Sequence, residues 1–296
     1  MSLCASRERA VIRVDMIRFG WPWRRRTAER AYRRGYRYLR GEGVGHDPVT
    51  ALRWLTRAAR LGHARAQHAL SMAYLSGVIG RAACVSWLGE ARGRSPAAVD
   101  NASLLYPRGI DVKADPGLAF AWAKAAARRG LACAEANLGM LYTRGLGCKR
   151  DFAEAAVWYR RAAQKGEAAG ALGLGILSEG GLGGPKNIPE ALRWYRTAAD
   201  AGNDIAASAL GLLLLSGEGA EPDPAQAQRW LSGPAARGYA HAQYGLGLLC
   251  LRGPADTVDV GRAELWLSKA AAQGHPGARA ALGGLKSAGA TGDAAA

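Results

Sequence analysis

The sequence lacks the features that would mark a membrane or exported protein. No apolar run reaches the length of about 18 residues that indicates a transmembrane helix. Near the start, Val11, Ile12 and Val14 are interrupted by charged residues, so no continuous apolar signal-peptide core is present. We therefore expect a protein without a transmembrane helix or secretory signal, located in the cytoplasm, with secretion as an effector as the open alternative.

Cysteine is scarce and irregularly placed. The five cysteines form no recurring pair and no C-x-x-C motif, which favours reduced, structural thiols over disulfides. The five histidines do not combine with cysteine or aspartate at a spacing typical of zinc ligands. We predict neither a metal site nor a bound cofactor.

Catalytic motifs are also missing. Residues 180–187 are rich in glycine, but Pro185 interrupts the Gly-Lys pair of a phosphate-binding loop and no strand precedes it, so we interpret this stretch as an inter-repeat loop. The chain has no Gly-x-Ser-x-Gly and no Ser-x-x-Lys motif. We therefore expect no enzymatic activity and no small-molecule substrate.

What the chain does contain is a repeat of 36 residues. A tryptophan, a glycine eight residues later and a Leu-Gly pair all recur at this interval, and an earlier copy keeps the same offsets. The tryptophans, which we expect to be structural and largely buried, are Trp54, Trp122, Trp158, Trp194, Trp230 and Trp266. Three marks with one period predict about seven and a half copies over residues 27–289, including a degenerate copy at about 81–115 around Trp87.

Each copy predicts two helices. The first helix starts at an Asp or Asn seven residues before the tryptophan, a residue type that caps helix N-termini: Asp47, Asp115, Asp151, Asn187, Asp223 and Asp259. A glycine ends each helix, and small residues on the second helix allow close packing. Alternating patterns of β-branched residues are rare, so the predicted fold is all-α, followed by a disordered tail at 290–296.

The segment at 191–202, Ala-Leu-Arg-Trp-Tyr-Arg-Thr-Ala-Ala-Asp-Ala-Gly, and the Ala-x-x-Leu-Gly that follows it resemble the Sel1-like repeat, a relative of the tetratricopeptide repeat. The resemblance implies a solenoid, a right-handed α/α superhelix of stacked helix pairs, whose first helices line a concave groove. It also implies a non-enzymatic scaffold or adaptor that binds a partner protein or peptide.

Other roles in this family are disfavoured by the sequence. Some bacterial relatives are secreted effectors or envelope-stress regulators, and some cysteine-rich secreted relatives have been ascribed a β-lactamase-like activity. The chain has no recurring cysteine pair that could bridge the two helices of each repeat, and it lacks the Ser-x-x-Lys motif. The adaptor interpretation is therefore preferred.

Charge is the most informative chemistry of the chain. The formal net charge is +16, and residues 1–40 hold twelve arginines against three acidic residues. We expect a basic, partly mobile segment at 1–26 and a basic patch made of Arg24, Arg25, Arg26, Arg30, Arg33, Arg34 and Arg37. This patch is a solvated cap of the repeat stack, a surface for an acidic protein or an anionic membrane, or a contact for nucleic acid.

A second basic series follows the first helices. Its members lie one residue before or two residues after a repeat tryptophan: Arg53, Lys124, Arg160, Arg193, Arg196 and Arg229. Because equivalent positions of stacked repeats share one surface, these residues either line a groove that attracts an acidic protein or peptide or are ordinary solvent-facing charges.

Overall fold

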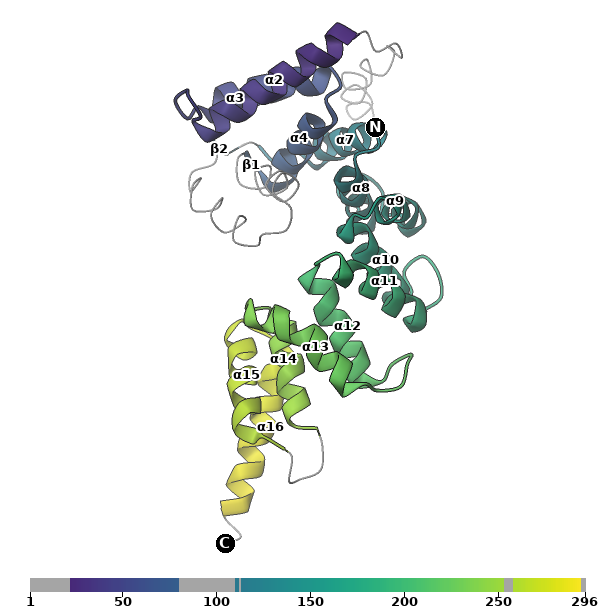
Figure 1. The fold of residues 1–296 in the computed structure, drawn as a ribbon, viewed down its shortest axis with the longest axis vertical. Coiled ribbons are helices and arrows are strands. Elements are labelled where there is room, and N and C mark those ends of the chain that lie inside the picture. The colour runs from purple at the N-terminus through teal and green to yellow at the C-terminus, as the bar shows by residue number, and fades with distance from the viewer. Residues whose placement is uncertain (1–21, 80–109, 112, 253–257, 294–296) are drawn as a thin grey trace. The chain divides into compact units, whose positions relative to one another are not determined.

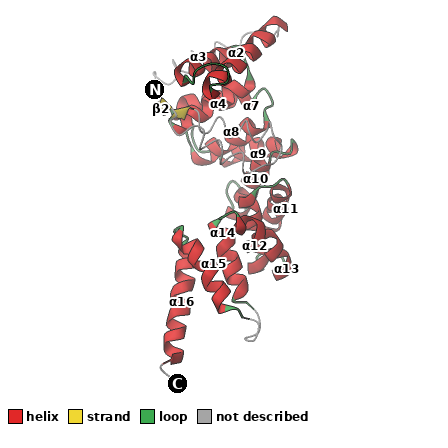
Figure 2. Cartoon of the chain, turned by 60° about the vertical axis from the view of Figure 1, so that its left-hand side comes forward, coloured by secondary structure: helices red, strands yellow, loops and turns green. Residues whose placement is uncertain are grey.

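The computed structural model describes residues 22–79, 110–111, 113–252 and 258–293 (Figure 1). Within these ranges the chain forms thirteen helices and one two-stranded ladder. Helices are red and strands yellow in Figure 2. The chain divides into two compact units, Met1–Lys165 and Gly166–Ala296. None of the described helices is both long and apolar enough to cross a membrane.

Unit 1 contains six described helices that pack in successive pairs. Helix α2 packs against α3, α4 against α7, and α8 against α9. Their bounds are Pro22–Arg40 (α2), Pro48–Arg60 (α3), Ala64–Ser76 (α4), Pro116–Ala127 (α7), Ala132–Arg144 (α8) and Phe152–Gln164 (α9). In α2–α3 and α8–α9 the second helix of one predicted copy packs against the first helix of the next, whereas α4 packs against the first helix that follows the predicted degenerate copy.

Unit 2 continues the same alternation. Helix α10 packs against α11, α12 against α13, and α14 against α15, and α16 packs against α15. The bounds are Ala168–Gly180 (α10), Ile188–Asp200 (α11), Asp204–Ser216 (α12), Pro224–Ala236 (α13), Ala240–Cys250 (α14), Val260–Ala272 (α15) and Pro276–Asp293 (α16). The thirteen helices thus correspond to six and a half of the predicted copies.

The helix boundaries follow from the capping residues that the sequence marks. All six predicted Asp and Asn residues are N-caps whose side chains accept a hydrogen bond from a backbone N–H three residues later. After each described first helix, the glycine has a positive φ, as at Gly202 with 86°. This left-handed conformation lets the chain turn at once into the next helix.

The region between α4 and α7 departs from the expected helical pattern. Strands β1 (Val78–Ile79) and β2 (Ile110–Asp111) form an antiparallel ladder, where the sequence predicts no strand. Val78, Ile79 and Ile110 are β-branched, a residue type that suits extended backbone. Helix α4 packs directly against α7, and most of the predicted degenerate copy, including Trp87, lies outside the described residues.

Glycines of the second helices allow the closest helix packing. A Cβ placed on Gly211 would lie 2.6 Å from Leu231 Cγ, and one on Gly247 would lie 2.6 Å from Leu267 Cγ. Such distances leave no room for a methyl group, so the facing helix occupies the space that any side chain would need. The structure therefore confirms the packing reason for the Leu-Gly pairs that contain Gly211 and Gly247.

The repeat tryptophans are less buried than predicted. Trp122 is buried, but the other five are only half-buried. The residue after each tryptophan is the core residue instead, and it is buried in every described copy: Leu55, Ala123, Tyr159, Tyr195, Leu231 and Leu267. The large ring is amphipathic and lies at the boundary, where Trp158 Nε1 donates to Glu154 Oε2 at 3.1 Å.

Both ends of the described fold extend beyond the predicted limits. Helix α2 begins at Pro22, five residues before the predicted start of the solenoid. Helix α16 continues past Gly289 to Asp293, four residues into the predicted tail.

Candidate functional site

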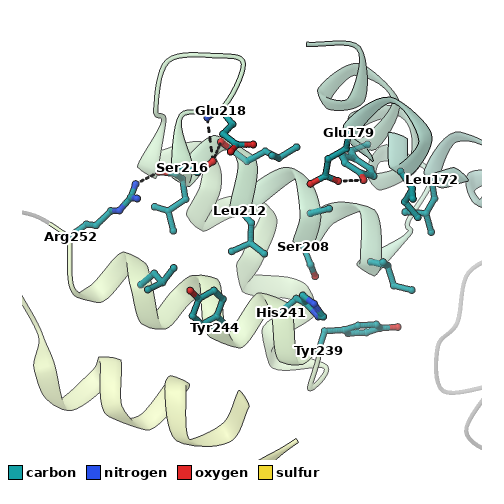
Figure 3. Close-up of a pocket in the computed structure, with 17 residues that line it drawn as sticks. Leu172, Glu179, Ser208, Leu212, Ser216, Glu218, Tyr239, His241, Tyr244 and Arg252 are labelled. Carbon is teal, nitrogen blue, oxygen red and sulfur yellow. Dashed lines mark hydrogen bonds between the residues drawn. The ribbon is translucent and has the colours of Figure 1, made fainter. Parts of the chain in front are cut away.

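A hollow of about 590 Å³ lies on one face of unit 2 (Figure 3). Its walls come mainly from the second helices α10, α12 and α14, and Tyr195 from the first helix α11 reaches into it. Within the described part of unit 2, this hollow brings together residues from the four helices α10, α11, α12 and α14. It is the candidate binding site.

The repeat places an apolar residue from each second helix in this hollow. Ile176, Leu212 and Leu248 all line it, and each directly follows the glycine of a Leu-Gly pair. Gly175 and Gly211 face the next first helix closely, and one helical residue corresponds to about 100° of rotation. The residue after each glycine is therefore turned away from that interface and toward the open side.

Several polar groups around the hollow are used within the protein. The hydroxyl of Tyr195 donates to Glu179 Oε2, and Arg252 Nη1 donates to the carbonyl oxygen of Leu215. Burial, together with the hydrogen bond to Glu179 and its charge, raises the pKa of Tyr195 well above its usual value. The Ser208 hydroxyl donates to the carbonyl oxygen of Asp204 at 2.7 Å. These groups shape the walls and leave apolar contact as the main chemistry of the hollow.

Several apolar residues of the hollow remain accessible. Ile176 is 44% exposed, Ile205 55% and Tyr239 39%. Large exposed hydrophobic side chains gathered in one concavity are typical of a surface that another molecule covers. Leu212 lies on α12 across from Tyr244 of α14 (Figure 3).

The predicted groove residues lie elsewhere. In unit 1, Arg53 is on α3, Lys124 on α7 and Arg160 on α9; in unit 2, Arg193 and Arg196 are on α11 and Arg229 is on α13. All are exposed except Lys124, which is half-buried, and none of the six lines the hollow. The resemblance implied that first helices line the groove, whereas second helices form most of the hollow in unit 2, because the apolar residues after the Leu-Gly pairs are on them.

The predicted basic patch lies on α2 in unit 1. Arg24 is half-buried beside Trp23, and the other six arginines of the patch are exposed. The Arg33 side chain donates to Glu29 Oε1 at 2.6 Å, and Arg37 Nε donates to the carbonyl oxygen of Glu42 at 3.2 Å. The helix therefore holds most of its guanidinium groups in solvent.

Metal ligands do not gather in the described part of the chain. No group of three or more His, Cys, Asp or Glu side chains there could hold a metal ion. His241 and His275 are close, with ring centroids 4.7 Å apart, but His275 Nδ1 accepts the Ala278 N–H at 3.2 Å as the start of α16. His275 therefore caps helix α16.

Comparison with known proteins identifies the repeat. A model of the Sel1 repeat family matches six segments, which together cover more than half of the chain: residues 31–63, 97–131, 134–167, 168–203, 204–232 and 240–275. The chain belongs to the Sel1 repeat family. It is an all-α solenoid protein, and Sel1 repeat proteins are generally protein-interaction scaffolds and typically not enzymes.

Two solved Sel1 repeat structures are similar to the chain. A Sel1 repeat protein from Oxalobacter formigenes is 27% identical, with a TM-score of 0.63 over 83% of this chain and 88% of that protein. The protective antigen c5321 of uropathogenic Escherichia coli, which has the same repeat fold, is 31% identical, with a TM-score of 0.54. That match covers 89% of this chain and 58% of c5321. No curated protein matches the sequence.

The Sel1 repeat offers a sequence signal for the hollow that our sequence analysis missed. The residue after each Leu-Gly pair is apolar at Met140, Ile176, Leu212 and Leu248, again at intervals of 36. Such a residue fits a core position as well as a surface position. Only the packing of the neighbouring glycine against the next helix assigns it to the open face.

Proposed function

We propose that this Sel1 repeat protein is a non-enzymatic scaffold whose hollow in unit 2 binds the apolar face of an amphipathic helix from a partner protein. The observation that carries the proposal is the set of Ile176, Leu212 and Leu248, which come from three successive second helices and line one concavity. A helix presents apolar side chains as a stripe, and a groove lined by apolar side chains is its usual complement.

The shape of the hollow supports a protein partner over a small molecule. Sites for small molecules cover most of the surface of their ligand. Here Ile176, Ile205 and Tyr239 at the rim are exposed by about two-fifths or more. A partner that lies along the surface and also covers the rim would bury these side chains. A small molecule held on the floor would leave them exposed.

A matched pair of double variants tests this proposal. Ile176→Glu with Ile205→Glu places charge in the hollow. The control, Val260→Glu with Leu265→Glu, changes residues of similar exposure, 45% and 53%, on α15 outside it. All four positions are exposed, so the fold should hold in both variants, which circular dichroism checks.

The readout is capture from native lysate followed by titration of the identified partner. We expect the hollow variant to lose a partner that the parent and the control retain. A peptide with the sequence of the amphipathic helix of that partner should likewise bind the parent and the control but not the hollow variant. Equal binding by all three proteins would contradict the proposal. Loss of binding in the control alone would locate the site on α15.

An acidic partner at the first helices is a second candidate. Arg193 and Arg196 of α11 are exposed and form no ion pair within the described part of the chain. If they bind an acidic segment, Arg193→Glu with Arg196→Glu should weaken binding, slow association and remove its salt sensitivity. If the double variant associates with the partner as fast as the parent at both of two salt concentrations, this surface is excluded.

A further inference from the structure

Two sets of residues that the sequence separates meet where α2 packs against α3. The Arg34 guanidinium lies 4.5 Å from the centre of the Trp54 ring, and the Arg57 guanidinium lies 5.3 Å from the same ring. Arg34 belongs to the basic patch of α2, whereas Trp54 and Arg57 belong to α3. The ring therefore joins cationic groups of both helices into one surface.

This surface, which we call the arginine face, consists of Arg26, Arg30 and Arg34 on α2 and Arg53 and Arg57 on α3. The three residues on α2 are four positions apart, as are the two on α3, so each set follows one side of its helix. All five side chains are exposed. Within the described residues none of the five has a carboxylate partner within ion-pair distance.

The carboxylates of this region are few and engaged elsewhere. Residues 22–63 contain eleven arginines and no lysine, against Glu29, Glu42 and Asp47. Glu29 pairs with Arg33 and Glu42 pairs with Arg40, while Asp47 caps α3. Like charges held this close repel one another, and a polyanion would relieve that repulsion.

We propose that the arginine face binds the phosphate backbone of a double-stranded nucleic acid. Guanidinium groups match phosphate oxygens with two parallel hydrogen bonds, which an ammonium group does not provide. Stacking on Trp54 restricts Arg34 and Arg57 before binding, which lowers the entropy lost when they contact an anion. Helix α2 is about 28 Å long, and a duplex presents a phosphate on each strand every ~3.4 Å.

The same geometry argues against other anionic partners. Base stacking on single strands needs an aromatic ring with a free face, and two arginines already pack on Trp54. Stable attachment to a membrane surface needs apolar side chains that insert, whereas the Trp54 ring between the charges of this face is half-buried and carries two guanidinium groups. An acidic protein carries its charges at lower density than a duplex, which has one per ~1.7 Å of its axis.

The experiment compares binding of a short mixed-sequence DNA duplex by the full chain and two double variants at several salt concentrations. Arg30→Gln with Arg53→Gln removes two charges of the face that do not stack on Trp54. Lys149→Gln with Arg150→Gln removes two exposed charges from the loop between α8 and α9. Melting curves confirm that both variants fold; if the first does not, Arg26→Gln with Arg30→Gln replaces it.

We expect the parent to bind the duplex with an affinity that falls steeply as salt increases. Removing two phosphate contacts should reduce the slope of log K against log salt by about 1.8, and the control should keep the slope of the parent. Equal slopes for the parent and the arginine-face variant would overturn the proposal. Tighter binding to phosphatidylserine vesicles or to a glutamate-rich peptide than to the duplex would also overturn it.

Discussion

The close approach of second helices to the next first helices predicts opposite effects for one substitution at two equivalent glycines. Gly211 in α12 and Gly283 in α16 each belong to a Leu-Gly pair. Replacing a glycine by alanine inside a helix favours the helix by ~1 kcal/mol. At Gly283 no heavy atom of the described residues, apart from the adjacent residues and the nearby backbone of its own helix, lies within 4 Å of the new Cβ, so Gly283→Ala should stabilise the protein by about this amount.

At Gly211 the gain in helix stability from alanine is offset by steric overlap of the new methyl group with Leu231. The new Cβ would lie 2.6 Å from Leu231 Cγ and 2.8 Å from its Cδ2, and Leu231 is completely buried. Overpacking of a core costs ~1–3 kcal/mol, so Gly211→Ala should be neutral or destabilise by up to ~2 kcal/mol. Urea unfolding followed by circular dichroism measures both variants. Equal stabilisation by the two substitutions would refute the packing argument.

Two further predictions concern buried polar groups. His63 Nδ1 accepts the Ala66 N–H at 3.2 Å, and burial lowers the pKa of His63, so the unfolded chain takes up its proton first. The contribution of His63 to stability should therefore be full above about pH 6.5 and fall as the pH drops through the lowered pKa. Asn203 makes the same cap in α12 without a titrating group, so His63→Asn should keep the cap and flatten the pH dependence of stability. Thermal melts at several pH values measure this. Lys165 Nζ lies 2.7 Å from Oε1 of the buried Glu135, so Lys165→Met should destabilise by ~3 kcal/mol, and adding Glu135→Gln should restore most of that loss in urea unfolding.

The repeat, its helices and their caps are predictable from sequence because they depend on local chemistry. Asp151 accepts the Glu154 N–H at 3.0 Å whatever surrounds the helix, and Gly202 adopts a positive φ because it has no side chain. A fixed interval also marks Trp158 and Trp194 as equivalent. These features required no knowledge of how one helix lies against another.

Burial and the binding surface were harder to predict because they depend on the direction each side chain takes in the packed pair. Trp194 attracts attention as a core residue, but Tyr195 after it is 1% exposed and fills the space beside Gly175. The shift of one residue turns a side chain by about 100° around the helix. Ile176 is exposed for the same reason, although its apolar character alone fits a core position equally well.

The position of the partner on unit 2 is the most direct test of the proposed scaffold role. A photo-reactive amino acid at Ile205, in the hollow, is compared with the same amino acid at Leu265, which is equally exposed on α15. With the partner identified by capture, our account predicts a cross-link from position 205 to an apolar position of an amphipathic helix, and none from position 265. Cross-links from position 265 with none from position 205 would contradict it.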